Sequence, residues 1–427
     1  MGMVIEPRSS FKGELRLPGD KSISHRAIMI GAIASGMTRI KNLLDCDDCD
    51  FTVRALKDMG IAISKRGGIA LVRGKGPGGL NAPGHPISLG NSGTSMRLLA
   101  GILAGQPFDA VLTGDGALLK RPMRRIVEPL KEMGADIWAE DNEHPPIHIK
   151  GARHLKPITY SMKLASAQVK SAILFAGLYG DGTTAVKERV ATRDHTERML
   201  RFFGADIAAK GKSVFLKGPA RLMARDLEVP SDISSAAFFM VGATILPKSR
   251  IVIRNVSINP TRSGVIAVLK GMGSRIRVTK KKEVYEPVGD IVVESSRTRG
   301  ITIDSGMIPA IIDEIPILAV LAALSKGRTV FRDIGELKVK ETDRVASIVS
   351  NLRNMGADIN VEGGDIVING VKGLKAAGLK SYGDHRTAMA MTIAALAASG
   401  QSGLDDPDCA AKSFPQFFDY LESIGRY

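Results

Sequence analysis

The chain has 427 residues, of which 44% are hydrophobic and 24% are charged, as expected for a folded globular protein of two or three domains. Its formal net charge of +15 favours anionic partners, but the basic residues are scattered and only 5% of residues are aromatic, which argues against a nucleic-acid-binding surface. The longest nearly apolar run, residues 388–398, is shorter than the roughly 18 residues of a membrane span. Because there are only three cysteines and residues 1–7 lack the apolar core of a signal peptide, we expect a cytoplasmic protein without disulfides or a membrane anchor.

The first predicted helix begins near Ser22, within residues 18–26, PGDKSISHR. Pro18 and Gly19 end the preceding segment, and apolar residues then recur at helical spacing. Similar helices, rich in alanine and other apolar residues, are predicted to begin near Ser92, Ser166, Ser234, Asp313 and Arg386. Each is followed by a more polar, amphipathic helix. The sequence therefore predicts six copies of one structural unit.

Each polar helix ends in the pattern Leu-x-x-(Met, Phe or Ile)-Gly, in which the glycine stands where a left-handed C-terminal cap belongs. The pattern ends at Gly60, Gly134, Gly204, Gly273, Gly356 and Gly425. Short β-branched runs, such as residues 250–253 and 328–331, lie between the helices. We therefore predict an α/β (α+β) fold of six β-α-β-α-β-β repeats, in which the apolar helix of each repeat is buried and the polar one lies outside.

Six repeats divide most naturally into two domains of three. We place the first three repeats in residues 18–231 and the last three in residues 232–427, with chain crossovers near residues 18–20 and 230–234. Because the sixth repeat ends where its strand should begin, we expect residues 1–17 to supply the missing strand and to complete the second domain. The two crossovers would then form a hinge, and a cleft between two domains is a common ligand site.

The starts of the predicted buried helices carry polar and basic residues. A helix N-terminus presents unpaired N–H groups and the positive end of the helix dipole, which together favour an anion. Lys21, His25 and Arg26 add cations at the first helix start, and residues 90–97, GNSGTSMR, form a loop of small residues at the second. One such start taken alone is more often an ordinary capped helix, but its recurrence along the chain favours anion binding.

Carboxylates accompany these cations in the fifth repeat. Two of them, the first being Asp313, stand at a helix start, where a carboxylate is usually only a favourable cap. Opposite so many cations, Asp313 is also a candidate proton acceptor. Residues 338–344, KVKETDR, are either a solvated helix start or a functional group. If they are helical, Lys340 and Arg344 lie one turn apart, and one face carries two cations with Glu341 beside them.

Other motifs do not indicate a cofactor. Cys46 and Cys49 form a single C-x-x-C without a second pair or histidine partners, so a metal site is not expected. No G-x-G-x-x-G motif follows a predicted strand, and there is no Walker-type loop. The sequence therefore gives no support for nucleotide binding.

Six motifs resemble those of the 5-enolpyruvylshikimate-3-phosphate (EPSP) synthases, and the resemblance runs over essentially the whole chain. They are residues 18–26, 91–97, 121–123, 340–344, 384–386 and 411–415. The resemblance implies two domains of three β-α-β-α-β-β units each. It also implies transfer of the enolpyruvyl group of phosphoenolpyruvate to the 5-hydroxyl of shikimate 3-phosphate in the shikimate pathway, with release of phosphate. For such an enzyme we expect a monomer without a metal or organic cofactor, of the kind targeted by glyphosate.

The resemblance also assigns residues to the two substrates. It implies that shikimate 3-phosphate is bound by Lys21, Ser22, Arg26, Ser166, Gln168, Arg193, Asp313 and Lys340. It implies that phosphoenolpyruvate is bound by Lys21, Gly93, Arg121, Gln168, Arg344, Arg386 and Lys412. Asp313 is expected to take the proton of the attacking hydroxyl and Glu341 to exchange a proton with C3 of the enol, while Lys21 assists. Arg193 is assigned through likeness to the second bacterial subtype of the family.

Two alternatives remain at the level of sequence. The sister enzyme UDP-N-acetylglucosamine enolpyruvyl transferase has the same fold and donor, but its catalytic loop carries a cysteine, and the corresponding residues 115–122 contain none. A basic repeat protein that binds nucleic acid is a second alternative, and its mark is salt-sensitive binding to DNA or RNA without saturable binding of either metabolite.

Overall fold

The computed structural model describes residues 2–151 and 154–424, and the chain folds into two compact units. The N-terminal unit is Gly19–Val229. The C-terminal unit combines Met1–Pro18 with Pro230–Tyr427. The chain therefore passes between the units twice, once after Pro18 and once after Val229.

The N-terminal unit alternates strands and helices along the chain. Its helices are α1 (Lys21–Ile33), α2 (Asp47–Asp58), α3 (Gly93–Leu103), η1 (Leu118–Lys120), α4 (Arg124–Glu132), α5 (Ala167–Gly177) and α6 (His195–Phe202). Its strands are β3 (Ser35–Lys41), β4 (Ala62–Arg66), β5 (Ile69–Lys75), β6 (Ile87–Ser88), β7 (Ala110–Thr113), β8 (Asp136–Ala139), β9 (Ile147–Lys150), β10 (Thr159–Ser161), β11 (Gly182–Lys187), β12 (Ile207–Lys210), β13 (Ser213–Gly218) and β14 (Leu227–Glu228).

The C-terminal unit repeats this alternation. Its helices are α7 (Ile233–Ile245), α8 (Gly264–Gly271), η2 (Ser305–Met307), α9 (Ile308–Ile311), α10 (Ile315–Ala323), η3 (Gly335–Leu337), α11 (Arg344–Asn354), α12 (His385–Leu396), η4 (Asp408–Lys412) and α13 (Phe417–Ile424). Its strands are β1 (Met3–Ile5), β2 (Lys12–Leu15), β15 (Arg250–Ser257), β16 (Arg275–Glu283), β17 (Pro287–Glu294), β18 (Thr302–Ile303), β19 (Arg328–Phe331), β20 (Asp358–Glu362), β21 (Asp365–Asn369), β22 (Gly378–Leu379) and β23 (Ser402–Leu404).

The named strands pair into small sheets that share one plan. Within the described residues, five four-stranded sheets have a parallel first pair followed by two antiparallel pairings: β14-β3-β5-β4, β6-β7-β9-β8, β10-β11-β13-β12, β2-β15-β17-β16 and β18-β19-β21-β20. The sheet β1-β23-β22 has three strands. In the second and third four-stranded sheets the chain order is β-α-β-α-β-β, with both helices on the way.

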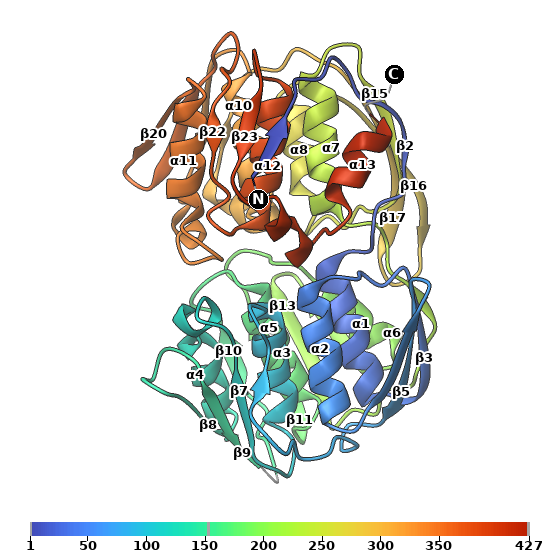
Figure 1. Ribbon diagram of the computed structural model, residues 1–427. Helices are drawn as coiled ribbons and strands as arrows, with labels where there is room; N and C mark the ends of the chain where they lie inside the picture. The colour runs from blue at the N-terminus through green and yellow to red at the C-terminus, as the bar shows by residue number, and fades with distance from the viewer. Residues whose placement is uncertain (1, 152–153, 425–427) are drawn as a thin grey trace. The chain divides into compact units, whose positions relative to one another are not determined.

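Some sheets take a strand from a distant part of the chain. In the N-terminal unit, β14 pairs in parallel with β3, so the last segment of the unit joins its first sheet. In the C-terminal unit, β2 pairs in parallel with β15, and β1 pairs antiparallel with β23. Figure 1 shows the blue β1 beside the red β23. Both partners belong to the unit in which the sequence places residues 1–17.

The predicted starts of the apolar helices are confirmed to within two residues. These helices begin at Lys21, Gly93, Ala167, Ile233, Ile315 and His385. They are also the buried helices: in α1, 11 of the 13 residues are buried. By contrast, α2 is a polar helix in which five of 12 residues are buried, all on one face. The predicted division into a buried and an outer helix therefore holds for this pair.

The predicted C-terminal glycine caps are confirmed wherever the structure describes them. Gly60, Gly134, Gly204, Gly273 and Gly356 all have φ between +80° and +99°, the left-handed region in which a side chain is strained. Gly425 lies outside the described residues.

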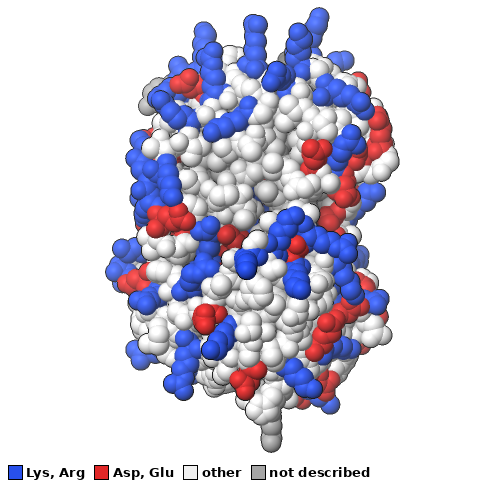
Figure 2. All heavy atoms as spheres, turned by 180° about the vertical axis from the view of Figure 1, so that it is seen from behind, with Lys and Arg blue, Asp and Glu red and all other residues white. Residues whose placement is uncertain are grey.

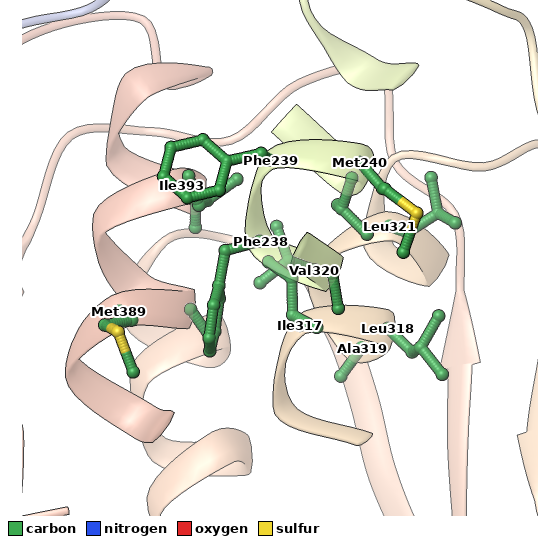
Figure 3. Close-up of a cluster of buried hydrophobic side chains, with 14 of the residues drawn as sticks. Phe238, Phe239, Met240, Ile317, Leu318, Ala319, Val320, Leu321, Met389 and Ile393 are labelled. Carbon is green, nitrogen blue, oxygen red and sulfur yellow. The ribbon is translucent and has the colours of Figure 1, made fainter. Parts of the chain in front are cut away.

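The cores of the two units form where the apolar helices pack on one another. In the N-terminal unit, a Cβ added at Gly101 of α3 would lie 2.3 Å from the carbonyl oxygen of Ala172 in α5, so glycine permits the close approach of these helices. In the C-terminal unit, Figure 3 shows α7, α10 and α12 contributing side chains to one cluster. Phe239 of α7 also contacts the rings of Phe414 and Phe417 in edge-on or tilted geometry.

Charged side chains are distributed over the surface. On the face drawn in Figure 2, lysine and arginine side chains are spread over both units and mixed with aspartate and glutamate. Within the described residues, no single helix is long and apolar enough to cross a membrane. Two helical segments joined by a sharp bend, Ser305–Ile311 and Ile315–Ala323, together reach the length and apolar composition of a span.

Candidate active site

The N-terminal unit gathers polar residues at the starts of its buried helices. At α1, the Asp20 carboxylate accepts a hydrogen bond from the backbone N–H of Ile23 at 2.9 Å and caps the helix. The next residue, Lys21, donates to Asp48 at the start of α2, with 2.8 Å between Nζ and Oδ2. Both side chains are 14% exposed, so this ion pair is largely buried and holds the lysine in place.

Arg26 joins three helices of this unit. Its Nε donates to Thr196 Oγ1 in α6 at 2.7 Å, and its Nη2 donates to Ser171 Oγ in α5 at 2.8 Å. Its Nη1 donates to the carbonyl oxygen of Ser22, one turn earlier in α1, at 2.9 Å. The predicted residues Ser22 and Arg26 are therefore in direct contact, and the partners of the arginine side chain fix the relative position of α1, α5 and α6.

Two guanidinium groups lie over the start of α3. A Cβ added at Gly93 would lie 2.9 Å from Arg121 Nη1 and 3.4 Å from Arg97 Nη1. Arg121 Nη2 donates to Asn91 Oδ1 at 2.8 Å, and Arg97 Nη1 donates to Gln168 Oε1 at 2.5 Å. The structure thus brings Gly93, Arg121 and Gln168 together, and Arg97 is the link between them that sequence reasoning left without a role.

Ser166 and Gln168 stand at the start of α5. Ser166 Oγ caps the helix by accepting from the backbone N–H of Val169 at 3.4 Å. Gln168 Nε2 donates to Thr94 Oγ1 in α3 at 2.9 Å. The oxygen of the Gln168 amide therefore accepts from Arg97 and its nitrogen donates to Thr94. These two bonds orient the amide between the starts of α3 and α5.

A buried lysine supports the loop that carries Arg193. Lys170 Nζ lies 2.9 Å from Glu188 Oε2 and 2.7 Å from Glu197 Oε1, and its side chain is 1% exposed. Burial opposes the charged form of Lys170, but the two carboxylates outweigh it and raise its pKa. Glu188 also accepts from the backbone N–H of Thr192 at 3.0 Å, next to the half-buried Arg193. Sequence reasoning missed both glutamates.

In the C-terminal unit, Arg344 is surrounded by carboxylates. Its Nε donates to Asp384 Oδ2 at 2.7 Å, its Nη2 to Glu341 Oε2 at 2.5 Å and its Nη1 to Asp313 Oδ1 at 3.3 Å. The Arg344 side chain is 1% exposed, whereas Asp313 and Glu341 are 16% and 19% exposed. The two predicted proton-transfer groups are therefore fixed by one buried cation and remain within reach of solvent.

Arg386 lies next to the same aspartate. Its Nη1 donates to the backbone carbonyl of Asp313 at 3.3 Å, and its Nε is 3.7 Å from Asp313 Oδ1. Asp384 caps α12 by accepting from the backbone N–H of Arg386 at 2.7 Å. Lys412 Nζ donates to the carbonyl oxygen of Gly383 at 2.8 Å, beside the same helix start. The predicted residues Asp313, Glu341, Arg344, Arg386 and Lys412 thus gather around the starts of α10, α11 and α12.

Lys340 differs from the sequence-based expectation. The helix α11 begins at Arg344, and Asp343 caps it by accepting from the backbone N–H of Ala346 at 3.0 Å. Lys340 precedes this cap in a non-helical segment, so it does not share a helical face with Arg344. The prediction of two cations on one helix face was wrong because the aspartate next to Arg344 is a better cap than any earlier residue.

Arg262 and Glu314 form a buried ion pair that sequence reasoning missed. Arg262 Nη1 lies 2.9 Å and 3.0 Å from the two carboxylate oxygens of Glu314. A comparison of the repeats could have singled out this arginine, because Arg193 and Arg262 each stand eleven residues before the capping glycine, Gly204 or Gly273.

The cysteines of the C-x-x-C motif are structural. Cys46 and Cys49 are both buried free thiols at the start of α2. A hydrogen bond between the Cys49 thiol and Cys46, together with burial, raises the pKa of Cys49, which makes its thiolate unfavourable as a ligand or nucleophile.

A buried hydroxyl chain connects His25 with the start of α3. His25 Nδ1 is 2.7 Å from Thr52 Oγ1, which is 2.7 Å from Ser95 Oγ, and Ser95 Oγ is 2.7 Å from Ser92 Oγ. Burial lowers the pKa of His25 to about 3. The imidazole is therefore neutral in the folded protein and serves as a hydrogen-bonding element of the core rather than as a cation.

This burial predicts a loss of stability in acid. The unfolded chain binds a proton at His25 below about pH 6.5 and the folded chain does not until about pH 3, so stability falls as pH is lowered through this range. We expect His25 to contribute a loss of about 2 kcal/mol in unfolding free energy between about pH 7 and pH 5. Urea titrations followed by fluorescence of the single tryptophan, Trp138 on β8, measure it. His25→Asn should reduce the pH dependence of the unfolding free energy by this amount, and His85→Asn, at an exposed position, should not. An equal pH dependence in the unmodified protein and both variants would contradict the assignment.

Comparison with known proteins agrees with this geometry. A family model described as EPSP synthase (3-phosphoshikimate 1-carboxyvinyltransferase) matches residues 5–421. A protein of Desulforamulus reducens named 3-phosphoshikimate 1-carboxyvinyltransferase is 48% identical over 427 residues, which cover 99% of each chain. One of the same name from Geobacillus kaustophilus is 48% identical over 420 residues, covering 97% of this chain and 98% of the relative.

Solved structures give the same result. A structure of EPSP synthase from Acinetobacter baumannii superposes with a TM-score of 0.89 at 43% sequence identity, covering 100% of this chain and 98% of the other. The predicted mixed α/β fold of this family is therefore confirmed. From the match along nearly its full length, the chain belongs to the EPSP synthase family.

Proposed function

We propose that the clusters at the helix starts carry out the reaction of this family. The enolpyruvyl (carboxyvinyl) group of phosphoenolpyruvate is transferred to the 5-hydroxyl of shikimate 3-phosphate, which gives 5-enolpyruvylshikimate 3-phosphate and phosphate, a step of the shikimate pathway to the aromatic amino acids. The observation that carries the proposal is the placement of Arg344 and Arg386 around Asp313 in a chain that belongs to the family.

Shikimate 3-phosphate is assigned mainly to the N-terminal unit. The proposed contacts are Lys21, Ser22, Arg26, Ser166, Gln168 and Arg193, together with Asp313 and Lys340 of the C-terminal unit. The starts of α1 and α5 support this assignment, because helix N-termini and fixed cations both favour a phosphate. Arg26 contacts residues of α1, α5 and α6, so these helices present a preformed arrangement to the substrate.

Phosphoenolpyruvate is assigned mainly to cationic residues near the helix starts. The proposed contacts are Lys21, Gly93, Arg121, Gln168, Arg344, Arg386 and Lys412. Two polyanionic substrates repel each other, and fixed cations offset this repulsion without the cost of reorganising solvent during the reaction. The absence of a side chain at Gly93, which Arg121 borders, suits the close approach of an anion to the backbone of α3.

The chemistry is an addition followed by an elimination. In the addition, the 5-hydroxyl attacks C2 of phosphoenolpyruvate while C3 gains a proton, which gives a tetrahedral ketal. In the elimination, C3 loses a proton and phosphate leaves. We assign the hydroxyl proton to Asp313 and the C3 proton to Glu341, with Lys21 assisting. Arg344 contacts both carboxylates and keeps them at fixed positions, as proton transfer at a defined atom requires.

We also infer a monomer that works in a reducing cytoplasm. The three cysteines of the sequence, Cys46, Cys49 and Cys409, are all free and buried. Among the described residues, the exposed large apolar side chains come from many elements, although Met37 and Leu71 lie on the paired strands β3 and β5. Light scattering after size-exclusion chromatography measures the molecular mass.

The choice of acceptor separates this function from that of the sister enzyme. Phosphate release is measured with phosphoenolpyruvate and either shikimate 3-phosphate or UDP-N-acetylglucosamine. The proposal expects saturable release with shikimate 3-phosphate alone. Release only with UDP-N-acetylglucosamine would refute it.

The two carboxylates are predicted to act in turnover rather than in binding. Asp313→Asn and Glu341→Gln should each lower kcat by about 100-fold or more, because they remove a proton-transfer group, and should change either KM by only a few-fold. Asp343→Asn is the matched control, since asparagine also caps a helix and this exposed carboxylate is assigned no chemical role. Near-normal kcat in either test variant removes that residue from the mechanism.

Gly93 is predicted to set the space for phosphoenolpyruvate. A Cβ there would lie 2.9 Å from Arg121 Nη1, so the guanidinium must shift. Gly93→Ala should raise KM for phosphoenolpyruvate by roughly tenfold, a loss of about 1.4 kcal/mol, and should affect KM for shikimate 3-phosphate less. Gly84→Ala is the control, because nothing lies within 4 Å of its added Cβ. An unchanged KM for phosphoenolpyruvate in Gly93→Ala would show that this space is not used.

A further inference from the structure

We propose that Arg262 is a positioning residue: it binds the carboxylate of Glu314 and thereby keeps the neighbouring guanidinium of Arg386 available for the anionic substrate. This inference rests on the proposed assignment of Arg386 to phosphoenolpyruvate. Arg262 itself is buried and is not proposed to touch either substrate.

The pair that Arg262 forms with Glu314 is buried and bidentate toward the carboxylate. Arg262 Nη1 is 2.9 Å from Oε1 and 3.0 Å from Oε2 of Glu314, and the two side chains are 2% and 0% exposed. Ser234, in the first turn of α7, accepts a hydrogen bond from Arg262 Nη2 and donates one to Glu314 Oε1. The pair therefore connects the segment before α8 with the starts of α7 and α10.

Arg386 faces the same carboxylate from another helix. Its Nη1 is 3.8 Å from Glu314 Oε1, at the outer limit of an ion pair. The distance from that oxygen to Arg262 is shorter by almost one ångström, and Ser234 also bonds it. Glu314 is thus committed to Arg262, while Arg386 interacts with it at longer range and contacts Asp313 as well.

Removal of Arg262 changes the balance between these groups. A buried carboxylate without a close cation is very unfavourable, so Glu314 would move toward the nearest remaining guanidinium, that of Arg386. A short ion pair would then occupy Arg386, and phosphoenolpyruvate would have to displace it. Such competition weakens ground-state and transition-state binding equally, which raises KM and leaves kcat nearly unchanged.

A purely structural role predicts a different pattern. If Arg262 served only to hold α7 and α10 together, its loss would lower stability and impair both substrates and kcat alike. The loss would also not depend on whether residue 314 carries a charge. The two accounts therefore differ in which kinetic constant changes and in whether a second substitution restores it.

The test uses the full-length enzyme with phosphoenolpyruvate and shikimate 3-phosphate. Arg262→Met should raise KM for phosphoenolpyruvate at least tenfold, with kcat and KM for shikimate 3-phosphate within threefold of the unmodified enzyme. The double variant Arg262→Met/Glu314→Gln removes the competing charge as well and should return KM for phosphoenolpyruvate to within about threefold. A double variant as impaired as Arg262→Met, or an equal rise in both KM values, would overturn the inference.

Two further variants complete the design. If Arg262→Met does not fold, as judged by circular dichroism, Arg262→Gln takes its place with the same expected rise, because it also removes the cation, and an unchanged KM for phosphoenolpyruvate in Arg262→Gln overturns the inference. Arg386→Met tests separately whether Arg386 binds phosphoenolpyruvate, the assignment on which the inference rests. If Arg386→Met leaves KM for phosphoenolpyruvate unchanged, the assignment of Arg386 has failed; if it raises KM and the Arg262 variants do not, only the role of Arg262 has failed.

Discussion

The site depends on the constraint that a buried cation needs partners. Water cannot solvate a guanidinium inside the protein, so each buried cation is fixed by the groups around it. Arg344 has three carboxylates, Arg262 has Glu314, and Lys170 has Glu188 and Glu197. These supports turn flexible side chains into fixed charges, and fixed charges are what two mutually repelling substrates require.

The repeated fold provides such supports at each helix start. An apolar helix surrounded by strands and further helices is buried along its length, and its N-terminus ends in a loop that carries polar side chains. Asp20, Ser92, Ser166, Asp232 and Asp384 all cap buried helices through a side-chain oxygen. Asp384 also binds Arg344, so one carboxylate both begins α12 and orients an arginine of α11. Hydrogen bonds of the same side chain therefore cap the helix and position a side chain of the site.

Helix starts and glycine caps could be predicted from sequence because they depend on neighbouring residues. The burial of α7 and the left-handed glycines follow from local patterns of this kind. The pair Arg262–Glu314 could not be predicted, because its members lie in different repeats and only the packing of α7, α8 and α10 brings them together. Lys340 was misplaced for a local reason: the cap at Asp343 starts α11 later than charge spacing suggested. The candidate site residues were predicted from the resemblance to EPSP synthases, whereas the contacts that hold them became visible only in the structure.

We propose that supported arginines, rather than mobile ones, bind phosphoenolpyruvate. A crystal structure with phosphoenolpyruvate and shikimate 3-phosphate bound tests it most directly. We expect phosphate or carboxylate oxygens of phosphoenolpyruvate at about 3 Å from the guanidinium nitrogens of both Arg344 and Arg386, with Arg262 still paired to Glu314. Phosphoenolpyruvate bound away from these two arginines, or Arg386 paired closely with Glu314 in the complex, would contradict it.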